Sequence, residues 1–253
     1  MKLETDEVLN YLLAYEHLQI IQHKDMFNFS LDTVLLAHFC SITKDVRTII
    51  DLGTNNAAIP LLLSTRTNKP VIGVEIQKKA CEIAKKNVVL NHLEKQITIV
   101  HADMKDYVQA HPKSSNLVLC NPPFFKLGEK SNLNESEYLT IARHEMMVTL
   151  KEIVATARGL LEYHGRFAMV HRPDRLIEII EAMKENDIEP KRLRFVYPKV
   201  GKDSHILLIE GIYKGQPGLK IEPPLYAHNQ DGSYSDEVRK MFGEDLDAET
   251  EKL

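Results

Sequence analysis

The alternation of strand-like and helical segments from Val46 onward is the feature that most restricts the fold of this chain. Short apolar runs, typical of buried strands, occur at 46–52, 71–76, 97–101, 117–121 and 166–171. Segments with a helical spacing of apolar residues separate them, at 59–64, 78–92, 144–163 and 174–186. Strands that alternate with helices predict an α/β fold with a parallel sheet, right-handed crossovers and helices on both faces.

The last two strand-like runs break this alternation. "RLRFVYP" (192–198) and "SHILLIEGIY" (204–213) are joined by a short loop without a helix, so they must pair antiparallel. A seven-stranded, mostly parallel sheet that ends in an antiparallel hairpin is typical of the Rossmann-like class I methyltransferase fold. Before this region, 17–40 predicts a short hairpin and then a helix from Asp32.

Composition excludes several classes of protein. The chain has 253 residues, a formal net charge of −4 and no apolar run of membrane-spanning length. The amino terminus lacks the basic-then-apolar pattern of a signal peptide. Three widely spaced cysteines, Cys40, Cys81 and Cys120, suit reduced core thiols in the cytoplasm. The scattered histidines show no metal-ligand spacing, so we expect no metal. The sequence does not fix the oligomeric state, and a monomer is the simpler expectation.

Polar residues end four consecutive predicted strands. Asp51 lies in "IIDLGTNNAAIPLLL" (49–63), Glu75 closes the next strand, and Asp103 and Asn121 follow the next two. The carboxyl ends of parallel strands share one edge of a sheet, where open α/β folds bind ligands. In such a site Asp51 and Gly53 order a tight turn, Glu75 accepts hydrogen bonds from ribose hydroxyls, and Asp103 accepts one from an adenine amino group. A single acid at a strand end is more often a helix cap, but three acids and an asparagine at four consecutive strand ends predict a nucleoside-type cofactor site.

"NLVLCNPPFF" (116–125) predicts a strand followed by a stiff segment, 121–125, at the same edge of the sheet; this segment is called the lip. Pro122 ends the strand because proline has no N–H for a sheet ladder. Pro122 and Pro123 then hold the chain extended, which presents Asn121 and Phe124 in fixed directions. The simpler alternative is an ordinary strand that ends at a proline.

At the level of family, the chain resembles class I S-adenosylmethionine-dependent methyltransferases of the small-domain type. Nearly end to end, it is similar to the bacterial tRNA1(Val) adenine-37 N6-methyltransferase-like family. The stretches that carry this resemblance are "FNFSLDTVLLAHF", "DLGTNNAAIPLLLS", "VIGVEIQ", "NPPFF", "ARHE", "VHRPDRL" and "LLIEGIYKGQPGLKIEPPL". The N-P-P-F motif alone indicates only methylation of an amino or amide nitrogen; the other segments are more specific.

The resemblance implies a division of the chain and roles for its residues. Residues 1–45 would form an N-terminal cap, 46–213 the S-adenosylmethionine-dependent domain, and 214–253 an extension that is partly extended or disordered. Glu75 would hold the cofactor's ribose and Asp103 its adenine. Phe29, Ser30 and Asp32 match the stretch that closes over the cofactor from the amino-terminal side.

One motif departs from the family pattern. The first motif usually reads D-x-G-x-G-x-G, whereas here Asp51 and Gly53 are followed by Asn55 and Ala57. Asn is the non-glycine residue best able to adopt a left-handed conformation, so Asn55 can keep the turn. Ala57 adds a methyl group where the helix begins. We therefore expect weaker cofactor binding, with loss of binding as the alternative.

The lip predicts the chemistry. An exocyclic amino group is a poor nucleophile, because its lone pair is delocalised into the ring. The Asn121 side-chain oxygen and the Pro122 carbonyl can accept its two hydrogens and leave the lone pair directed at the methyl donor. Phe124, followed by Phe125, offers a ring on which an extruded base can stack.

A basic stretch is the predicted contact with RNA. "PKRLRFVYPKVGK" (190–202) contains Lys191, Arg192, Arg194, Lys199 and Lys202, while Arg143, Arg172 and Arg175 would lie nearer the pocket. Lysines and arginines of this kind bind the phosphate backbone. An exposed edge strand protected by its lysines explains the stretch equally well.

Three functions remain open at this stage. The first is methylation of adenine N6 in RNA, with tRNA as the favoured substrate. The second keeps the fold but modifies a guanine amino group in ribosomal RNA or a glutamine amide in a protein. The third is a catalytically silent RNA- or partner-binding relative, which the substitutions in the first motif suggest.

Overall fold

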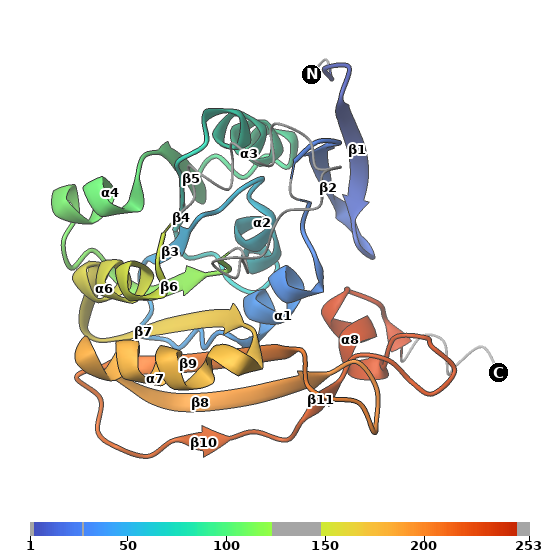
Figure 1. Cartoon of the computed structure of the whole chain (residues 1–253). Helices are drawn as coiled ribbons and strands as arrows, with labels where there is room; N and C mark the ends of the chain where they lie inside the picture. The colour runs from blue at the N-terminus through green and yellow to red at the C-terminus, as the bar shows by residue number, and fades with distance from the viewer. Residues whose placement is uncertain (1–2, 27, 123–147, 247–253) are drawn as a thin grey trace, which may run out of the picture.

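A mixed sheet forms the centre of the computed structural model, which describes residues 3–26, 28–122 and 148–246 (Figure 1). In this part of the chain the sheet has nine strands, of which eight follow the order β10-β8-β9-β7-β6-β3-β4-β5 and β11 pairs with β8. The parallel strands of the predicted core are β3 (Ile49–Leu52), β4 (Val71–Glu75), β5 (Ile97–His101), β6 (Ser115–Cys120) and β7 (Leu161–His171). The remaining long strands, β8 (Ile188–Tyr197) and β9 (Ile206–Tyr213), pair antiparallel as predicted.

Helices cover both faces of the sheet. Alternate residues of β3 supply the two cores, since Ile49 packs in one cluster and Ile50 and Leu52 in the other. The helices of the first core are α1 (Leu31–Phe39), α2 (Ala58–Ser64) and α3 (Lys78–Leu90). Those of the second are α4 (Met104–Ala110), α6 (Leu150–Leu160) and α7 (Leu176–Glu185), which follows a short 3₁₀ turn, η1 (Pro173–Arg175). The predicted α/β fold, mostly parallel with an antiparallel hairpin, is confirmed, but among the described residues the sheet has nine strands rather than the seven predicted.

Two predictions in this region were wrong in detail. The helix expected over 144–163 ends at Leu160 among the described residues, and β7 begins at Leu161 rather than after Gly165. The pairing of β6 with β7 is irregular at this point: Ser115 pairs with Leu161, and the next pair is Leu117 with Arg166. The regular part of the pairing therefore begins only near Gly165, where the strand was predicted to start. Helix α4 was not predicted; only Tyr107 of it is buried, so its apolar periodicity is weak.

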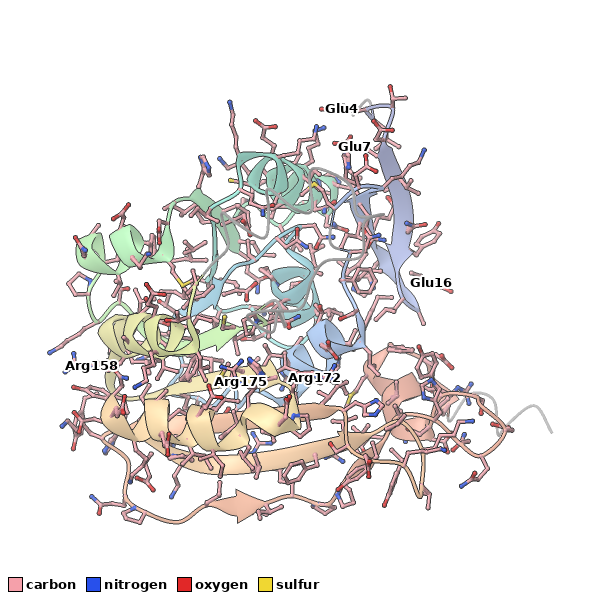
Figure 2. The ribbon with its side chains drawn as sticks, in the orientation of Figure 1. Glu4, Glu7, Glu16, Arg158, Arg172 and Arg175 are labelled. Carbon is pink, nitrogen blue, oxygen red and sulfur yellow. The ribbon has the colours of Figure 1, made fainter. Side chains whose placement is uncertain are left out.

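The N-terminal hairpin is longer than predicted and begins earlier. It forms a separate two-stranded sheet from β1 (Glu7–Leu12) and β2 (Tyr15–His23), whereas the prediction started near residue 17. Ion pairs hold it on α3: Lys79 and Lys86 bind Glu4, and Lys86 also binds the buried Glu7 at 2.6 Å. Glu4 and Glu7 lie at the α3 side of the hairpin in Figure 2.

The C-terminal segment wraps along the far side of the sheet. Strands β10 (Lys220–Ile221) and β11 (Leu225–Tyr226) both pair with β8 in parallel, and α8 (Asp236–Met241) follows. The extended path expected after Lys214 is therefore present, as two short strands. Strand β8 is covered on both sides, so its interpretation as an exposed edge was wrong.

The remaining general expectations concern thiols, metals and membranes. Cys40, Cys81 and Cys120 are buried and free. Within the described ranges, no three His, Cys, Asp or Glu side chains gather as a metal site would require. The same ranges contain no helix with the length and apolar character needed to span a bilayer.

Candidate active site at the carboxyl edge of the sheet

The four predicted strand-end residues lie on one edge of the sheet. In space their strands follow the order β6, β3, β4, β5, and all four run in parallel. Asp51 and Glu75 belong to β3 and β4, while Asp103 and Asn121 come directly after the ends of β5 and β6. Residues that are 70 positions apart in sequence thus share one edge.

The turn after β3 keeps the left-handed backbone that the glycine-rich motif requires. Gly53, Asn55 and Ala57 have φ angles of 72°, 50° and 66°. The expectation that Asn55 holds this conformation is confirmed. Ala57 adopts it as the N-cap of α2, fully buried and without the local hydrogen bonding available to Asn. A left-handed Ala costs roughly 1–2 kcal/mol, so the turn survives its substitutions under strain.

Glu75 ties this turn to the next strand end. Its carboxylate is buried and accepts from the Asn55 N–H at Oε2 and from the Gln77 N–H at Oε1, both at 2.8 Å. Burial raises the pKa of Glu75, and these backbone donors oppose that shift. The Ile76 N–H is a third backbone donor to this carboxylate, which leaves one lone-pair direction for a ribose hydroxyl.

Asp51 is a buried carboxyl group without a hydrogen-bond partner among the described residues. It is 0% exposed, and both of its oxygens lack such a bond. Burial raises its pKa from 3.8 to about 7; the Thr54 hydroxyl, which lies near but does not meet hydrogen-bond geometry, opposes the shift, and the negative charge of Glu75 adds to it. Thr54 Oγ1 and Asn56 Nδ2 are also buried and lack a partner in this part of the structure. Buried polar atoms in native proteins nearly always have a protein, water or ligand partner, so this cluster is suited to a polar ligand.

Asp103 has a local role in addition to its predicted one. Its Oδ1 accepts from the Lys105 N–H at 2.8 Å and thereby caps α4. Asp103 therefore acts as a helix cap, which is the simpler explanation for an acid at a strand end. Oδ2 lies 3.9 Å from Lys105 Nζ and remains partly exposed, so it can still accept from a ligand.

Asn121 is held by helix α1. Its Nδ2 donates to Thr33 Oγ1 at 3.2 Å, and Thr33 Oγ1 also accepts from the Ser30 N–H at 3.4 Å. Because the amide nitrogen binds Thr33, the side-chain oxygen is left for another donor. Thr33 was not identified from the sequence; its position three residues after the N-cap Ser30 was the only local signal.

The start of α1 also meets the end of β7. Phe29 packs on the first core cluster, and Ser30 caps the helix. Asp32 is largely desolvated, which raises its pKa, while Ser30 and Arg172 lower it. Arg172 itself is exposed. Figure 2 shows Arg172 and Arg175 at the end of α7 nearest α1, with Arg158 at the opposite end.

The basic stretch 190–202 does not form one patch. Arg192 donates to Glu222 at 2.6 Å, Ser41 Oγ at 2.7 Å and the Phe39 carbonyl at 2.9 Å. Arg194 makes a two-pronged pair with Glu237 at 2.6 and 2.9 Å. These arginines bind the chain's own C-terminal segment, which argues against the predicted contact with RNA. Lys191 binds carbonyl groups of Gln216 and Pro217.

The other predicted substrate residues divide into two groups. Lys199 and Lys202 lie in the β8–β9 loop, and Arg175 pairs with Glu178 at 2.9 Å. Phe124, Phe125 and Arg143 lie outside the described residues, so their predicted roles stay predictions.

The sequence of this chain matches a known protein family and several named relatives. Residues 19–186 match the family model of the Methyltransferase small domain. A tRNA1(Val) (adenine(37)-N6)-methyltransferase of Aliivibrio salmonicida is 28% identical over 212 residues, which cover 83% of this chain and 87% of the relative.

Solved structures share the fold at lower identity. A predicted O-methyltransferase of Agrobacterium tumefaciens superimposes with a TM-score of 0.67 at 20% identity, covering 84% of this chain and 95% of its own. A geranyl diphosphate methyltransferase, solved in complex with S-adenosylmethionine, has a TM-score of 0.52 at 12% identity, covering 72% of this chain and 84% of its own.

Proposed function

The chain belongs to the Methyltransferase small domain family, and we propose that it transfers a methyl group from S-adenosylmethionine to the N6 amino group of an adenine in tRNA. The fixed orientation of Asn121 is the observation that carries this proposal. Its nitrogen donates to Thr33, which leaves its oxygen to accept from another donor. The relative from Aliivibrio salmonicida, which is named for this reaction, supports the choice of adenine in tRNA.

The unpaired polar atoms around the first turn fit S-adenosylmethionine. The cofactor carries an ammonium group, a carboxylate and two ribose hydroxyls, so it can supply both donors and acceptors. Asp51, Thr54 and Asn56 present unpaired buried atoms of both kinds. We assign Glu75 to the ribose and the free oxygen of Asp103 to the adenine amino group, with Gly53 and Asn55 shaping the turn. Phe29, Ser30 and Asp32 would border the site from α1. When bound, the cofactor supplies a methyl group already activated on a sulfonium.

The residues of the lip prepare the amino group for transfer. Asn121 Oδ1 and the Pro122 carbonyl would accept its two hydrogens, which holds the group in place and reduces delocalisation of its lone pair. Positive charge that develops on the nitrogen is then stabilised by two fixed dipoles, with no reorganisation during reaction. Pro122 is buried, which keeps its carbonyl group in place, and the hydrogen bond to Thr33 holds the Asn121 side chain. Phe124 would stack on the base. None of these roles needs a general base.

The retained turn geometry supports an active enzyme over a silent relative. Asn55 and Ala57 keep the left-handed conformations that a cofactor-binding turn uses. Together with an RNA substrate, the three reduced thiols suit a cytoplasmic protein, and we propose that it acts there as a monomer.

Nucleoside mass spectrometry tests the proposal. The purified protein is incubated with S-adenosylmethionine and an unmodified transcript of a bacterial tRNA(Val), and the digested RNA is examined for N6-methyladenosine. Ribosomal RNA and total cell protein are incubated in parallel, so that the product identifies the substrate class. Methylated guanine or glutamine in place of methylated adenine would refute the assignment, and failure to bind cofactor in calorimetry would indicate a silent relative.

A further inference from the structure

A cavity with aromatic walls lies in the C-terminal segment, outside the part of the chain that matches the family model. Its volume is about 330 Å³, and it lies between the β8–β9 loop and residues 224–237. The side chains that matter for its chemistry are Val200, Tyr226, His228, Asn229, Gln230 and Glu237.

The cavity faces the same edge of the sheet as the candidate active site. Strand β8 runs parallel to β7, because both pair antiparallel with β9. Tyr226 of β11 pairs in parallel register with Tyr197, at the carboxyl end of β8. Across the sheet, β6 and β11 are four strand spacings apart, or roughly 19 Å at about 4.8 Å per spacing. Helix α8 also packs on α1, which holds Asn121. Figure 1 shows β11 and α8 on the side toward which β6 and β7 point.

Contacts on both sides hold the aromatic walls in place. Tyr226 packs on Tyr197 with ring centroids 5.6 Å apart, and His228 stacks on Tyr234 at 4.6 Å and 25°. The His228 N–H donates to the Pro198 carbonyl at 3.0 Å, which fixes this residue to the end of β8. The walls are therefore preorganised, which lowers the entropic cost of binding a ligand.

The open surfaces suit a flat, polar, heteroaromatic ligand. Tyr226, which lines the cavity, is 37% exposed, and Val200 adds an apolar side. The Asn229 amide nitrogen already donates to Ser233 Oγ at 3.1 Å and to the Tyr234 carbonyl at 3.2 Å, so its oxygen is left to accept from the edge of a base. The Gln230 amide can both donate and accept. Glu237 would repel RNA, but Arg194 neutralises it at 2.6 Å. Lys199 directly precedes Val200 and can supply a cation for a phosphate, although Asp231 also lies near it.

We propose that this cavity binds a base of the substrate RNA at a nucleotide other than the methylated one. The inference rests on the proposed function, because it takes RNA as the substrate. Stacking on Tyr226 would position the RNA roughly 19 Å from the lip, so that the target base reaches Asn121 only when the surrounding RNA also fits. Base–aromatic stacking accounts for roughly a 5- to 140-fold gain in affinity per base. The C-terminal segment would then select the RNA.

A single tryptophan provides a direct test, because the sequence contains none. Tyr226→Trp puts a reporter in the cavity. Tyr163→Trp is the matched control, since Tyr163 is 70% exposed near the start of β7, at the opposite edge of the sheet. Titration with the unlabelled tRNA(Val) transcript should quench the fluorescence of Tyr226→Trp and leave that of Tyr163→Trp unchanged.

Binding and kinetics give a second measurement that does not depend on the reporter. Tyr226→Ala should weaken tRNA binding at least roughly 5-fold and raise KM for tRNA, whereas Tyr226→Phe, which keeps the ring, should behave as wild type. A silent Tyr226→Trp, or unchanged affinity in Tyr226→Ala, in a protein that still methylates tRNA would overturn this inference alone. A wild-type protein that neither binds nor methylates tRNA would overturn it together with the proposed function.

Discussion

Replacing Asp51 with Asn should remove a pH-dependent cost to the stability of the cofactor-free protein. The Asp51 carboxyl group is fully buried, and burial raises its pKa from 3.8 to about 7. The folded protein therefore holds the proton that the unfolded chain releases above pH 4. The free energy of unfolding is therefore highest below about pH 4, falls as pH rises from about 4 to about 7, and is level above that range.

The size of the effect follows from the two pKa values. A tenfold change in an ionisation constant corresponds to about 1.4 kcal/mol, so the full shift of Asp51 from 3.8 to about 7 corresponds to roughly 4 kcal/mol of lost stability. At pH 5 only about 1.6 kcal/mol of this loss is present, because pH 5 lies just over one unit above the pKa of the carboxyl in the unfolded chain. Between pH 5 and pH 8 the loss should thus grow by about 2.5 kcal/mol. Asn has the same shape and no charge, so Asp51→Asn should not show this growth.

Urea unfolding of both proteins at pH 5, 6, 7 and 8 measures the difference. The difference is needed because two histidines act in the opposite direction. Partial burial of His38 and burial of His171 lower the pKa of each to about 4, so both reduce the stability of the folded protein as pH falls below about 6.5. The advantage of Asp51→Asn over wild type should increase by about 2.5 kcal/mol from pH 5 to pH 8. Asp103→Asn, which removes a partly exposed carboxylate at the same edge, is the control for loss of charge. An advantage that stays constant with pH, or that shrinks, would refute the reasoning.

Four further changes test the site. Asn121→Ala should lower kcat roughly 100-fold or more with the cofactor Kd within a few-fold, because the acceptor acts mainly in the transition state; more than about a tenth of wild-type activity would contradict this role. Thr33→Val should lower kcat roughly 10- to 100-fold at unchanged cofactor Kd, with Thr33→Ser restoring it, whereas equal losses in both variants would assign Thr33 to folding alone. Glu75→Ala should weaken cofactor binding by about 1–3 kcal/mol in calorimetry, and an unchanged Kd would remove Glu75 from the site. Asn55→Gly combined with Ala57→Gly should tighten cofactor binding by relieving two left-handed non-glycine residues, and no gain would show that the turn already fits.

The sequence by itself determined the sheet and the edge that carries the site. Strands that alternate with helices must run parallel, and parallel strands bring their carboxyl ends together, so Asp51, Glu75 and Asn121 meet without any knowledge of packing. The left-handed conformation of Asn55 was equally readable, because few residues besides Gly and Asn tolerate it, whereas that of Ala57 was not. These conclusions rest on local backbone preferences, which a short window of sequence contains.

Short or irregular elements were less readable. Helix α4 buries only Tyr107, so no apolar stripe marks it in the sequence. The start of β7 at Leu161 is obscured by the helical spacing of the residues before it and by the irregular pairing near Ser115. The first strand of the hairpin, Glu7–Leu12, is mostly exposed and lacks a strong alternation.

Only the tertiary structure decided which partners the polar side chains take. Thr33 and Asn121 are 88 positions apart, and their hydrogen bond exists because α1 packs beside the end of β6. Arg194 is of a residue type that often binds RNA, yet in the fold the C-terminal segment packs beside β8 and Glu237 pairs with Arg194. A charged side chain binds whatever the fold brings within about 3 Å, and that distance depends on how distant segments pack, which no local pattern of residues specifies.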